Sequence, residues 1–289
     1  MIVKLIAFEN DPSNSCTAYP DNGGNPLVSV ATEIDFTDIL SCDDYNPSSS
    51  NTMAFTAFPS FPTASPTAGV NYYLSGNITI DDGETLTLQG NTIAIAANTT
   101  ITVKAGGRLN IRPNGTKRTH LFACGDMWNG ILNIDATGSG VGIIDAHTST
   151  SSTYLNKIED AICAIHCKGN RLEVRNTTFD HNKSALQVEE VPNHTLSTSS
   201  RITGSFFLCS DKILSKAPHS GEIPYAHVTL TNIPFQIEFG KDHNTTQEVS
   251  NSCVGLLLEN SSVVIRNTEF KNIFNRFDLF LPNVRSSAI

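Results

Sequence analysis

The chain has 289 residues, of which 39% are hydrophobic, and its formal net charge is -9. This apolar content is enough to bury a core, which excludes disorder over most of the length. The 19 lysines and arginines are spread thinly along the sequence. Since a phosphate backbone needs a concentrated cationic stripe, we expect no nucleic-acid partner.

Asparagine (27), serine (28) and threonine (30) together outnumber all charged residues, a composition typical of tight turns and polar strand faces rather than helices. No stretch approaches 18 uninterrupted apolar residues, so we expect no membrane span. The seven cysteines contain no Cys-x-x-Cys pair, which argues against a zinc ribbon. Cys163 and Cys167 are expected to be small core hydrophobes, whereas Cys16 and Cys42 are better disulfide candidates.

Three regions follow from the composition. Residues 1–45 carry no clear period and have no role that we can assign. Residues 46–69 are rich in Pro, Ser and Thr and indicate a linker or an extended segment laid over a neighbour. From residue 70 to residue 289, short alternating strands follow one another, separated by Gly- and Asn-containing turns.

A spacing of 23 residues relates aliphatic positions in the first part of this repeating region. Ile78 and Ile80 return as Ile101 and Val103, and Leu86 and Leu88 return as Leu109 and Ile111, then as Leu132 and Ile134. Three strands of about five residues with three turns fill such an interval, which is one rung of a parallel β-helix. Each strand then pairs with its equivalent one rung later, so like side chains stack in ladders. We therefore predict an all-β protein, a right-handed parallel β-helix with loop insertions.

A second repeated motif, aliphatic-x-Asn/Gly-x-x-Phe, occurs four times in the second half of the chain. The copies are Val174–Phe179, Ile202–Phe207, Leu230–Phe235 and Ile265–Phe270. The Asn or Gly falls where the strand must bend, because these residues tolerate a left-handed φ. We predict two structural ladders, one of Asn176, Asn232 and Asn267, with Gly204 replacing one Asn, and one of Phe179, Phe207, Phe235 and Phe270. Polar insertions at 147–156, 189–200, 215–225 and 241–252 would form loops on the coil.

Four segments also carry a resemblance to a known family. They are Gly106–Ile111, Cys124–Ile131 with its Trp-x-Gly-Ile element, Ile158–Ala161, and Asn176–Asn182. Together they resemble the secreted right-handed parallel β-helix repeat proteins of Bacteroidetes, whose fold is pectate-lyase-like, over roughly residues 72–280. The resemblance implies an extracellular or outer cell-surface location. No sorting domain of the kind many of those proteins carry is recognisable in this sequence.

Enzymes with pectate-lyase-like folds cleave acidic polysaccharides with paired aspartates or with a calcium-bound carboxylate cluster and a basic residue. Of the polygalacturonase-like signatures, only Asp-Asp occurs here, outside the expected positions. The best catalytic candidates are Asp180 and His181, since no other copy of the Phe motif carries this pair. A basic residue such as Arg175 or Lys183 would complete the set. Asp and His are also ordinary turn residues, so a structural role stays open.

Two further binding candidates have competing interpretations. Trp128, the only tryptophan, would stack on a sugar ring or serve as a packed anchor. Glu159 with Asp160, or Asp135 with Asp145, could bind Ca2+ at a corner, although the carboxylates lack a ligand spacing. We expect no other cofactor.

These features favour a secreted or cell-surface module with a structural or adhesive role. Its loops and sheet faces would meet glycans or other cell-surface polymers, and its open ends would allow self-association into filaments. The alternative is a polysaccharide lyase or hydrolase that acts on an acidic polysaccharide.

Overall fold

The structure is a computed structural model that describes residues 2–4, 33–35, 42–48, 55–134, 140–147, 154–190, 195–240 and 246–273. The chain divides into two compact units, Met1–Ser41 and Cys42–Ile289. In the first unit, β1 (Ile2–Lys4) pairs antiparallel with β2 (Glu33–Asp35). The candidates Cys16 and Asp135 lie outside the described residues.

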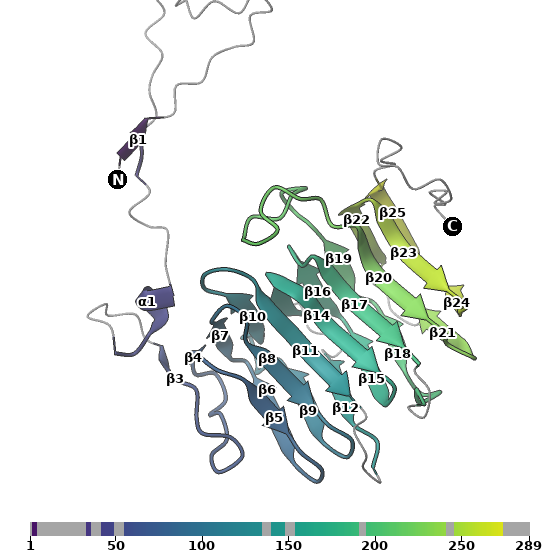
Figure 1. The fold of residues 1–289 in the computed structure, drawn as a ribbon, viewed down its shortest axis with the longest axis horizontal. Helices are drawn as coiled ribbons and strands as arrows, with labels where there is room; N and C mark the ends of the chain where they lie inside the picture. The colour runs from purple at the N-terminus through teal and green to yellow at the C-terminus, as the bar shows by residue number, and fades with distance from the viewer. Residues whose placement is uncertain are drawn as a thin grey trace, which may run out of the picture. The chain divides into compact units, whose positions relative to one another are not determined.

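The second unit is built from three parallel sheets that share one coiling chain (Figure 1). Sheet I contains β3 (Thr56–Ala57), β4 (Tyr72–Leu74), β7 (Thr92–Ile95), β10 (His120–Ala123), β13 (Asn156–Glu159), β16 (Thr177–Asp180), β19 (Phe206–Leu208), β22 (Gln247–Ser252) and β25 (Thr268–Ile273). Sheet II contains β5 (Ile78–Ile80), β8 (Thr100–Val103), β11 (Trp128–Ile134), β14 (Ala161–Lys168), β17 (Ser184–Glu189), β20 (Ala226–Thr231) and β23 (Val254–Glu259). Sheet III contains β6 (Thr85–Gln89), β9 (Arg108–Arg112), β12 (Ile143–His147), β15 (Arg171–Arg175), β18 (Arg201–Thr203), β21 (Gln236–Phe239) and β24 (Ser262–Ile265).

From β4 onward the chain visits sheets I, II and III in turn, and each strand from β4 to β22 pairs parallel with the strand three elements later in the same sheet. β3 pairs parallel with β4 at the start of sheet I. Ile78 lies opposite Ile101, and Leu86 lies opposite Leu109, as the 23-residue interval predicts. The protein is therefore a parallel β-helix. Among the described residues, no helix has the length and apolar character needed to cross a membrane.

The prediction that Leu132 and Ile134 follow Leu109 and Ile111 one rung later was wrong. Leu132 lies in sheet II, where it pairs with Thr102, and the residue that follows Leu109 in sheet III is Ile144. The turn between β9 and β10 is lengthened by a small bridge between Asn114 and Lys117, so the next rung is longer and the phase shifts. Residue identity at a fixed interval thus marks equivalent positions only while the turns keep their length.

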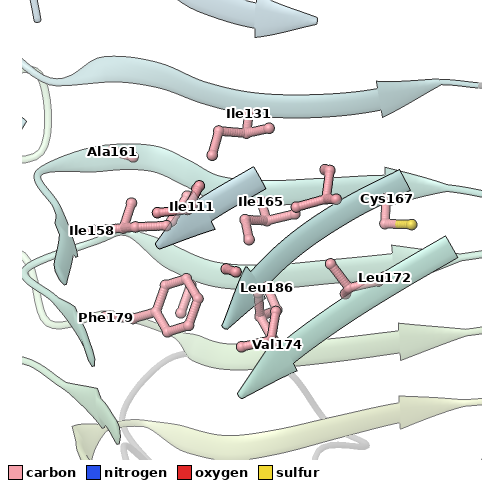
Figure 2. Packing of buried hydrophobic residues seen from close by; sticks show 14 of the residues in the cluster. Ile111, Ile131, Ile158, Ala161, Ile165, Cys167, Leu172, Val174, Phe179 and Leu186 are labelled. Carbon is pink, nitrogen blue, oxygen red and sulfur yellow. The ribbon is translucent and has the colours of Figure 1, made fainter. Parts of the chain in front are cut away.

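The core consists of columns of inward side chains, one residue from each rung (Figure 2). In sheet I the column is Tyr72, Ile93, Leu121, Ile158, Phe179, Phe207, Val249 and Phe270. In sheet III it is Leu88, Ile111, Ala146, Val174, Ile202, Phe239 and Ile265. Since most of these side chains are fully buried, each rung stabilises the next mainly by apolar burial.

The corners between sheet III and sheet I carry the predicted bends. Asn176, Gly204 and Asn267 all have a left-handed φ of 50°, 58° and 49°. Immediately after the first two corners, Phe179 and Phe207 stack with ring centroids 5.2 Å apart and planes within 6°.

Phe235 does not belong to this stack. Asn232, with a φ of 56°, lies between sheets II and III, where its Oδ1 accepts a hydrogen bond from Asn260 Nδ2 at 3.1 Å. Phe235 is therefore half-buried at a different corner, and Phe239 stacks on Phe207 in its place at 5.8 Å. The Leu230–Phe235 copy of the motif was placed at the wrong corner because two corners of the coil use the same bend chemistry.

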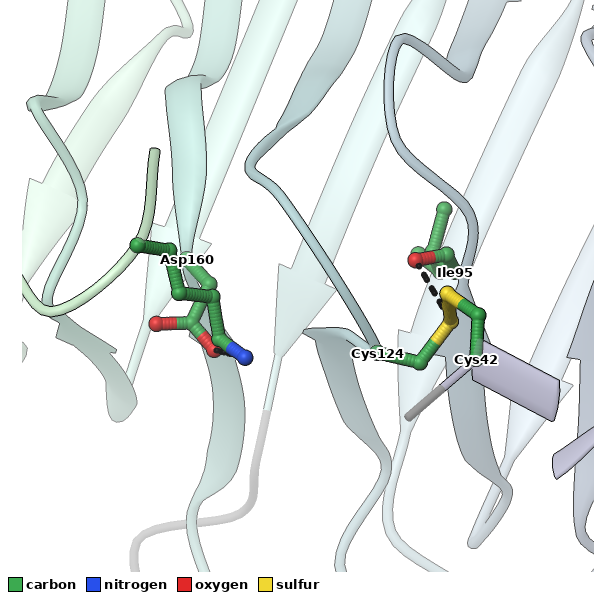
Figure 3. Close-up of a disulfide and its surroundings, with 5 residues drawn as sticks. Cys42, Ile95, Cys124 and Asp160 are labelled. Carbon is green, nitrogen blue, oxygen red and sulfur yellow. Dashed lines mark hydrogen bonds and ion pairs between the residues drawn. A yellow bond between two sulfur atoms is a disulfide. The ribbon is translucent and has the colours of Figure 1, made fainter. Parts of the chain in front are cut away.

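Residues ahead of the first rung are fastened to the coil. The short helix α1 (Cys42–Tyr45) is joined to the sheet I side by a disulfide between Cys42 and Cys124, whose Sγ lies 3.4 Å from the Ile95 carbonyl oxygen (Figure 3). Tyr45 then packs edge to face against Phe122, with ring centroids 5.4 Å apart.

Cys163 and Cys167 are free thiols. Cys167 is fully buried in the core, as expected, whereas Cys163 is only half-buried. The reason is a bulge in the pairing of β11 with β14, which shifts the register between Gly130 and Ile131 and turns Cys163 off the face of Ile165.

Candidate functional site

Asp180 and His181 lie at the corner where sheet I passes into sheet II. β16 ends at Asp180, and His181 takes a left-handed φ of 53°. Asp160 occupies the same corner one rung earlier with a φ of 59°. His181 therefore fills the same left-handed corner position as Asp160, one rung later, and Asn, Asp and His are the residues other than Gly that adopt this conformation most often.

The Asp180 carboxylate is occupied by structural contacts. Its Oδ1 accepts hydrogen bonds from Ser210 N and Ser210 Oγ, both at 3.0 Å, and Oδ2 lies 3.4 Å from Lys157 Nζ. The His181 ring lies between two carboxylates, with Nδ1 3.2 Å from Asp180 and Nε2 3.1 Å from Asp211. Asp180 thus anchors the chain that follows β19, and His181 bridges the same two segments.

Glu159, Asp180 and His181 form a group whose possible metal-ligand atoms lie within 4.8 Å of one another. Burial works to raise the pKa of Glu159, but hydrogen bonds and charge from His120 and Lys157 outweigh it and lower that pKa to about 2. Lys157 contacts both Glu159 and Asp180. Because the Lys157 ammonium already stands where a cation would bind, this group does not fit a calcium site.

Asp160 and Asp145, the described members of the other suggested calcium pairs, are also neutralised by basic side chains. Asp160 pairs with Lys216 at 3.8 Å, and Asp145 pairs with Arg108 and Arg112 (for Asp160, Figure 3). Burial raises the pKa of Asp160 to about 7, an effect that Lys216 only partly offsets. None of these carboxylates offers the open oxygen cluster that calcium requires.

The segment between β19 and β20 packs over this corner as a strap, residues 209–225. Met127 N donates to the Ala217 carbonyl at 2.8 Å, and Leu214 and Cys209 are buried against Met127. Lys183 Nζ lies 2.9 Å from His219 Nε2, and His219 Nδ1 lies 3.0 Å from Glu222. The polar side chains of the corner therefore hold an insertion in place.

Trp128 is not a sugar platform. Its side chain is fully buried, and its indole Nε1 donates to the Glu159 carbonyl at 2.9 Å. Both faces of the ring lie in the core, so Trp128 is the packed anchor of the two alternatives.

The two basic residues suggested for an enzyme are not brought together with Asp180 and His181. Arg175 projects from sheet III and pairs with Glu173. Lys183 is near the corner but faces His219. No acid, imidazole and basic residue from that set converge on a common point among the described residues.

A different charged surface, which the sequence reading missed, lies on the outer side of sheet III. We call it the arginine face, and it comprises Arg108, Asn110, Arg112, Asp145, Arg171, Glu173, Arg175 and Arg201. Five of the nine arginines of the chain belong to it. In the register, Asn110, Asp145, Glu173 and Arg201 form a central row, one residue from each successive rung.

The two acids of the central row lie beneath the arginines. The side chains of Asp145 and Glu173 are 9% and 6% exposed, whereas the five arginine side chains are 25% to 42% exposed. Glu173 pairs with Arg171 at 2.8 Å, with Arg201 at 3.5 Å and with Arg175. The carboxylates thus form an inner layer that holds the guanidinium groups in an outer layer.

The arginines are close enough to act on one another. Burial lowers the pKa of Arg175, and the neighbouring charges of Arg201, Arg112 and Arg171 lower it further, while Asp145 raises it. The signal that could have revealed this surface is a repeated pentapeptide, Arg-Leu-Asn-Ile-Arg at 108–112 and Arg-Leu-Glu-Val-Arg at 171–175. On a strand, both arginines and the middle residue of each copy project from the same side.

The fold and these two polar surfaces define a parallel β-helix protein with a cationic sheet face and a strapped corner. Comparisons with protein-family models, with curated proteins and with solved structures return no match to this chain. Membership of the secreted family that the sequence resembles therefore stays a prediction.

Proposed function

We propose that the chain is a secreted or cell-surface β-helix module that binds glycans in a structural or adhesive role. The observation that carries the proposal is the arginine face, an extended row of partly exposed side chains spread over four consecutive rungs of one sheet. A surface of this shape suits a long ligand that meets several rungs at once. It does not suit a small substrate held at one point.

The disulfide between Cys42 and Cys124 supports the location in this proposal. Disulfides persist in oxidising surroundings such as the cell exterior and are rare where thiols are kept reduced.

The contacts of Asp180 and His181 support a binding role over a catalytic one. A general base needs a lone pair that can reach a substrate proton, yet Ser210 and Lys157 occupy the Asp180 oxygens. Residues 209–225 cover the same corner. The contacts of Asp180 and His181 therefore hold the strap, residues 209–225, in place.

One observation favours the second candidate, a polysaccharide lyase or hydrolase. Glu159, Asp180 and His181 place two carboxylates and an imidazole within 4.8 Å, and such groups could share proton transfer if the strap opened.

A single set of incubations separates the two candidates. The protein is mixed with neutral and acidic polysaccharides, and retention on each polymer is measured beside the release of reducing ends and of unsaturated products. We expect retention on at least one polysaccharide without cleavage. Cleavage that disappears in Asp180→Asn would establish the enzyme instead, and absence of retention on every polysaccharide would overturn the binding role.

A further inference from the structure

The arginine face has a positive excess on a protein that is acidic as a whole. Its five guanidinium groups stand against Asp145 and Glu173, with Glu238 one rung beyond, whereas the formal charge of the chain is -9. Five of the nine arginines lie on this one sheet face, and their positive charges repel one another. The charges of Arg201, Arg112 and Arg171 each lower the pKa of Arg175 for this reason. Such a cluster lowers its energy when anions bind to it.

The side chains are held ready for an anionic ligand. Asp145 contacts Arg108 and Arg112, and Glu173 contacts Arg171, Arg175 and Arg201, so a buried carboxylate holds one nitrogen of each guanidinium group. Guanidinium groups fixed in this way lose little side-chain entropy on binding a carboxylate or a sulfate.

The arginines repeat along the coil axis. Arg108 and Arg171 both lie opposite Ile143 on the intervening strand, so they are two rungs apart, about 9.6 Å at the usual strand spacing. Arg112 and Arg175 bear the same relation at the other end of the two strands. Two parallel pairs of cationic groups therefore run along the coil with the same interval, and Arg201 lies one rung beyond Glu173 in the central row between them.

We propose that the arginine face binds a linear acidic polysaccharide that lies along the coil axis, with carboxylate or sulfate groups between the two arginine pairs. The proposal deepens the glycan-binding function above and rests on it. A polysaccharide fits better than a nucleic acid because the outward positions of these strands carry no Phe, Tyr or Trp on which bases could stack.

The test compares retention of the protein on four immobilised polymers at low and high salt. They are a sulfated polysaccharide (heparin), a carboxylated one (polygalacturonate), a neutral one (dextran) and single-stranded DNA. We expect retention on heparin, on polygalacturonate or on both, with elution by salt, and the two acidic polymers decide between sulfate and carboxylate. Retention on dextran alone would overturn the inference and leave the glycan-binding function standing. Retention on DNA equal to or above that on the acidic polysaccharides would overturn the ligand class, and retention on none would overturn both proposals.

Matched variants locate the binding surface. In Arg112→Gln with Arg201→Gln, we expect the affinity for the retained polysaccharide to fall by about tenfold or more, because two charge-assisted contacts are lost. The control is Lys104→Gln with Lys271→Gln, which removes the same charge from side chains that are both 43% exposed and lie off the arginine face. Equal losses in the two double variants would overturn the assignment to this face.

A charge-conserving pair covers the case in which the arginine variant fails to fold. Arg112→Lys with Arg201→Lys keeps both charges and removes only the planar two-pronged donor. A drop in affinity for the retained polysaccharide at unchanged net charge is expected, and affinity equal to that of the unmodified protein would show that guanidinium geometry on this face does not recognise the ligand.

Discussion

Asp145 on β12 and Glu173 on β15 lie directly opposite each other in the parallel register of sheet III. Two acids at adjacent positions repel each other, and the pair persists because five arginines surround it. The same arrangement keeps the arginines together, so the stability of this part of the coil and its cationic outer layer have one physical origin.

Glu173→Gln should therefore destabilise the protein. Arg171, Arg175 and Arg201 would lose a nearly buried counter-charge, which we expect to lower the free energy of unfolding by about 1.5–3 kcal/mol. Urea denaturation measures the change. The control, Glu269→Gln, removes an acid that is 53% exposed and paired with Lys271, and it should change stability by less than about 0.5 kcal/mol. Similar values for both variants would contradict the role assigned to Glu173.

The aromatic stack gives a second prediction. Phe207 is fully buried between Phe179 and Phe239, so Phe207→Ala should cost about 3–5 kcal/mol through the lost burial and the cavity left behind. Phe235→Ala makes the same chemical change at a half-buried position and should cost less than half as much. Thermal or urea unfolding of the two variants checks the order. A larger loss at Phe235 would mean that the stack passes through that residue.

Gly130 allows the backbone of β11 to approach β14 at the bulge. It has a φ of 110°, and a Cβ at this position would lie 1.6 Å from the Cys163 carbonyl oxygen. Gly130→Ala should therefore fold poorly or lose several kcal/mol of stability, since neither backbone can move without breaking the ladder. Gly115 also has a left-handed φ, 56°, but has open space around it. Gly115→Ala should lose only about 1–2 kcal/mol, from backbone strain, and an equal loss at both sites would contradict the close approach.

The buried carboxyl group of Asp160 should make the free energy of unfolding depend on pH. Its pKa is about 7 in the folded protein, raised chiefly by burial, and about 3.9 in an unfolded chain. The folded state thus binds the proton more tightly, so the contribution of Asp160 to stability is complete below pH 4 and is lost as the pH rises to about 7. Asp160→Asn should therefore become more stable relative to the unmodified protein between pH 4 and pH 7. Asparagine also suits the left-handed φ of 59° at this corner.

Urea denaturation at several pH values between 4 and 7.5 measures this difference. Asp126→Asn, which removes the same charge from an exposed side chain, serves as the control. A stability difference for Asp160→Asn that does not change with pH would show that the burial of its carboxyl group has no thermodynamic consequence.

Much of the coil could be predicted because ladder positions repeat in the sequence. Ile78 and Ile101, or Leu86 and Leu109, are chemically alike because each packs on the other one rung away. The same logic failed at Leu132 and Phe235, where a longer turn and a second Asn corner changed the phase. A repeat in sequence reports stacking, but it does not report which corner of the coil a bend belongs to.

The candidate sites were harder to predict. Asp180 and His181 stood out because no other rung repeats them, yet the partners that define their role, Ser210 and Asp211, are 30 residues away. The burial of Trp128 could not be read from its neighbours in sequence either. Such long-range contacts arise only when successive rungs stack.

The sequence by itself determined the class of fold, because a parallel coil requires like residues at every turn and those residues recur along the chain. It also contained the two Arg-x-x-x-Arg strands without disclosing their proximity. Only the tertiary structure decided that residues 108–112 and 171–175 lie two rungs apart on one sheet. Stacking brings their charges within reach of one another, and the buried Asp145 and Glu173 hold the arginines in place.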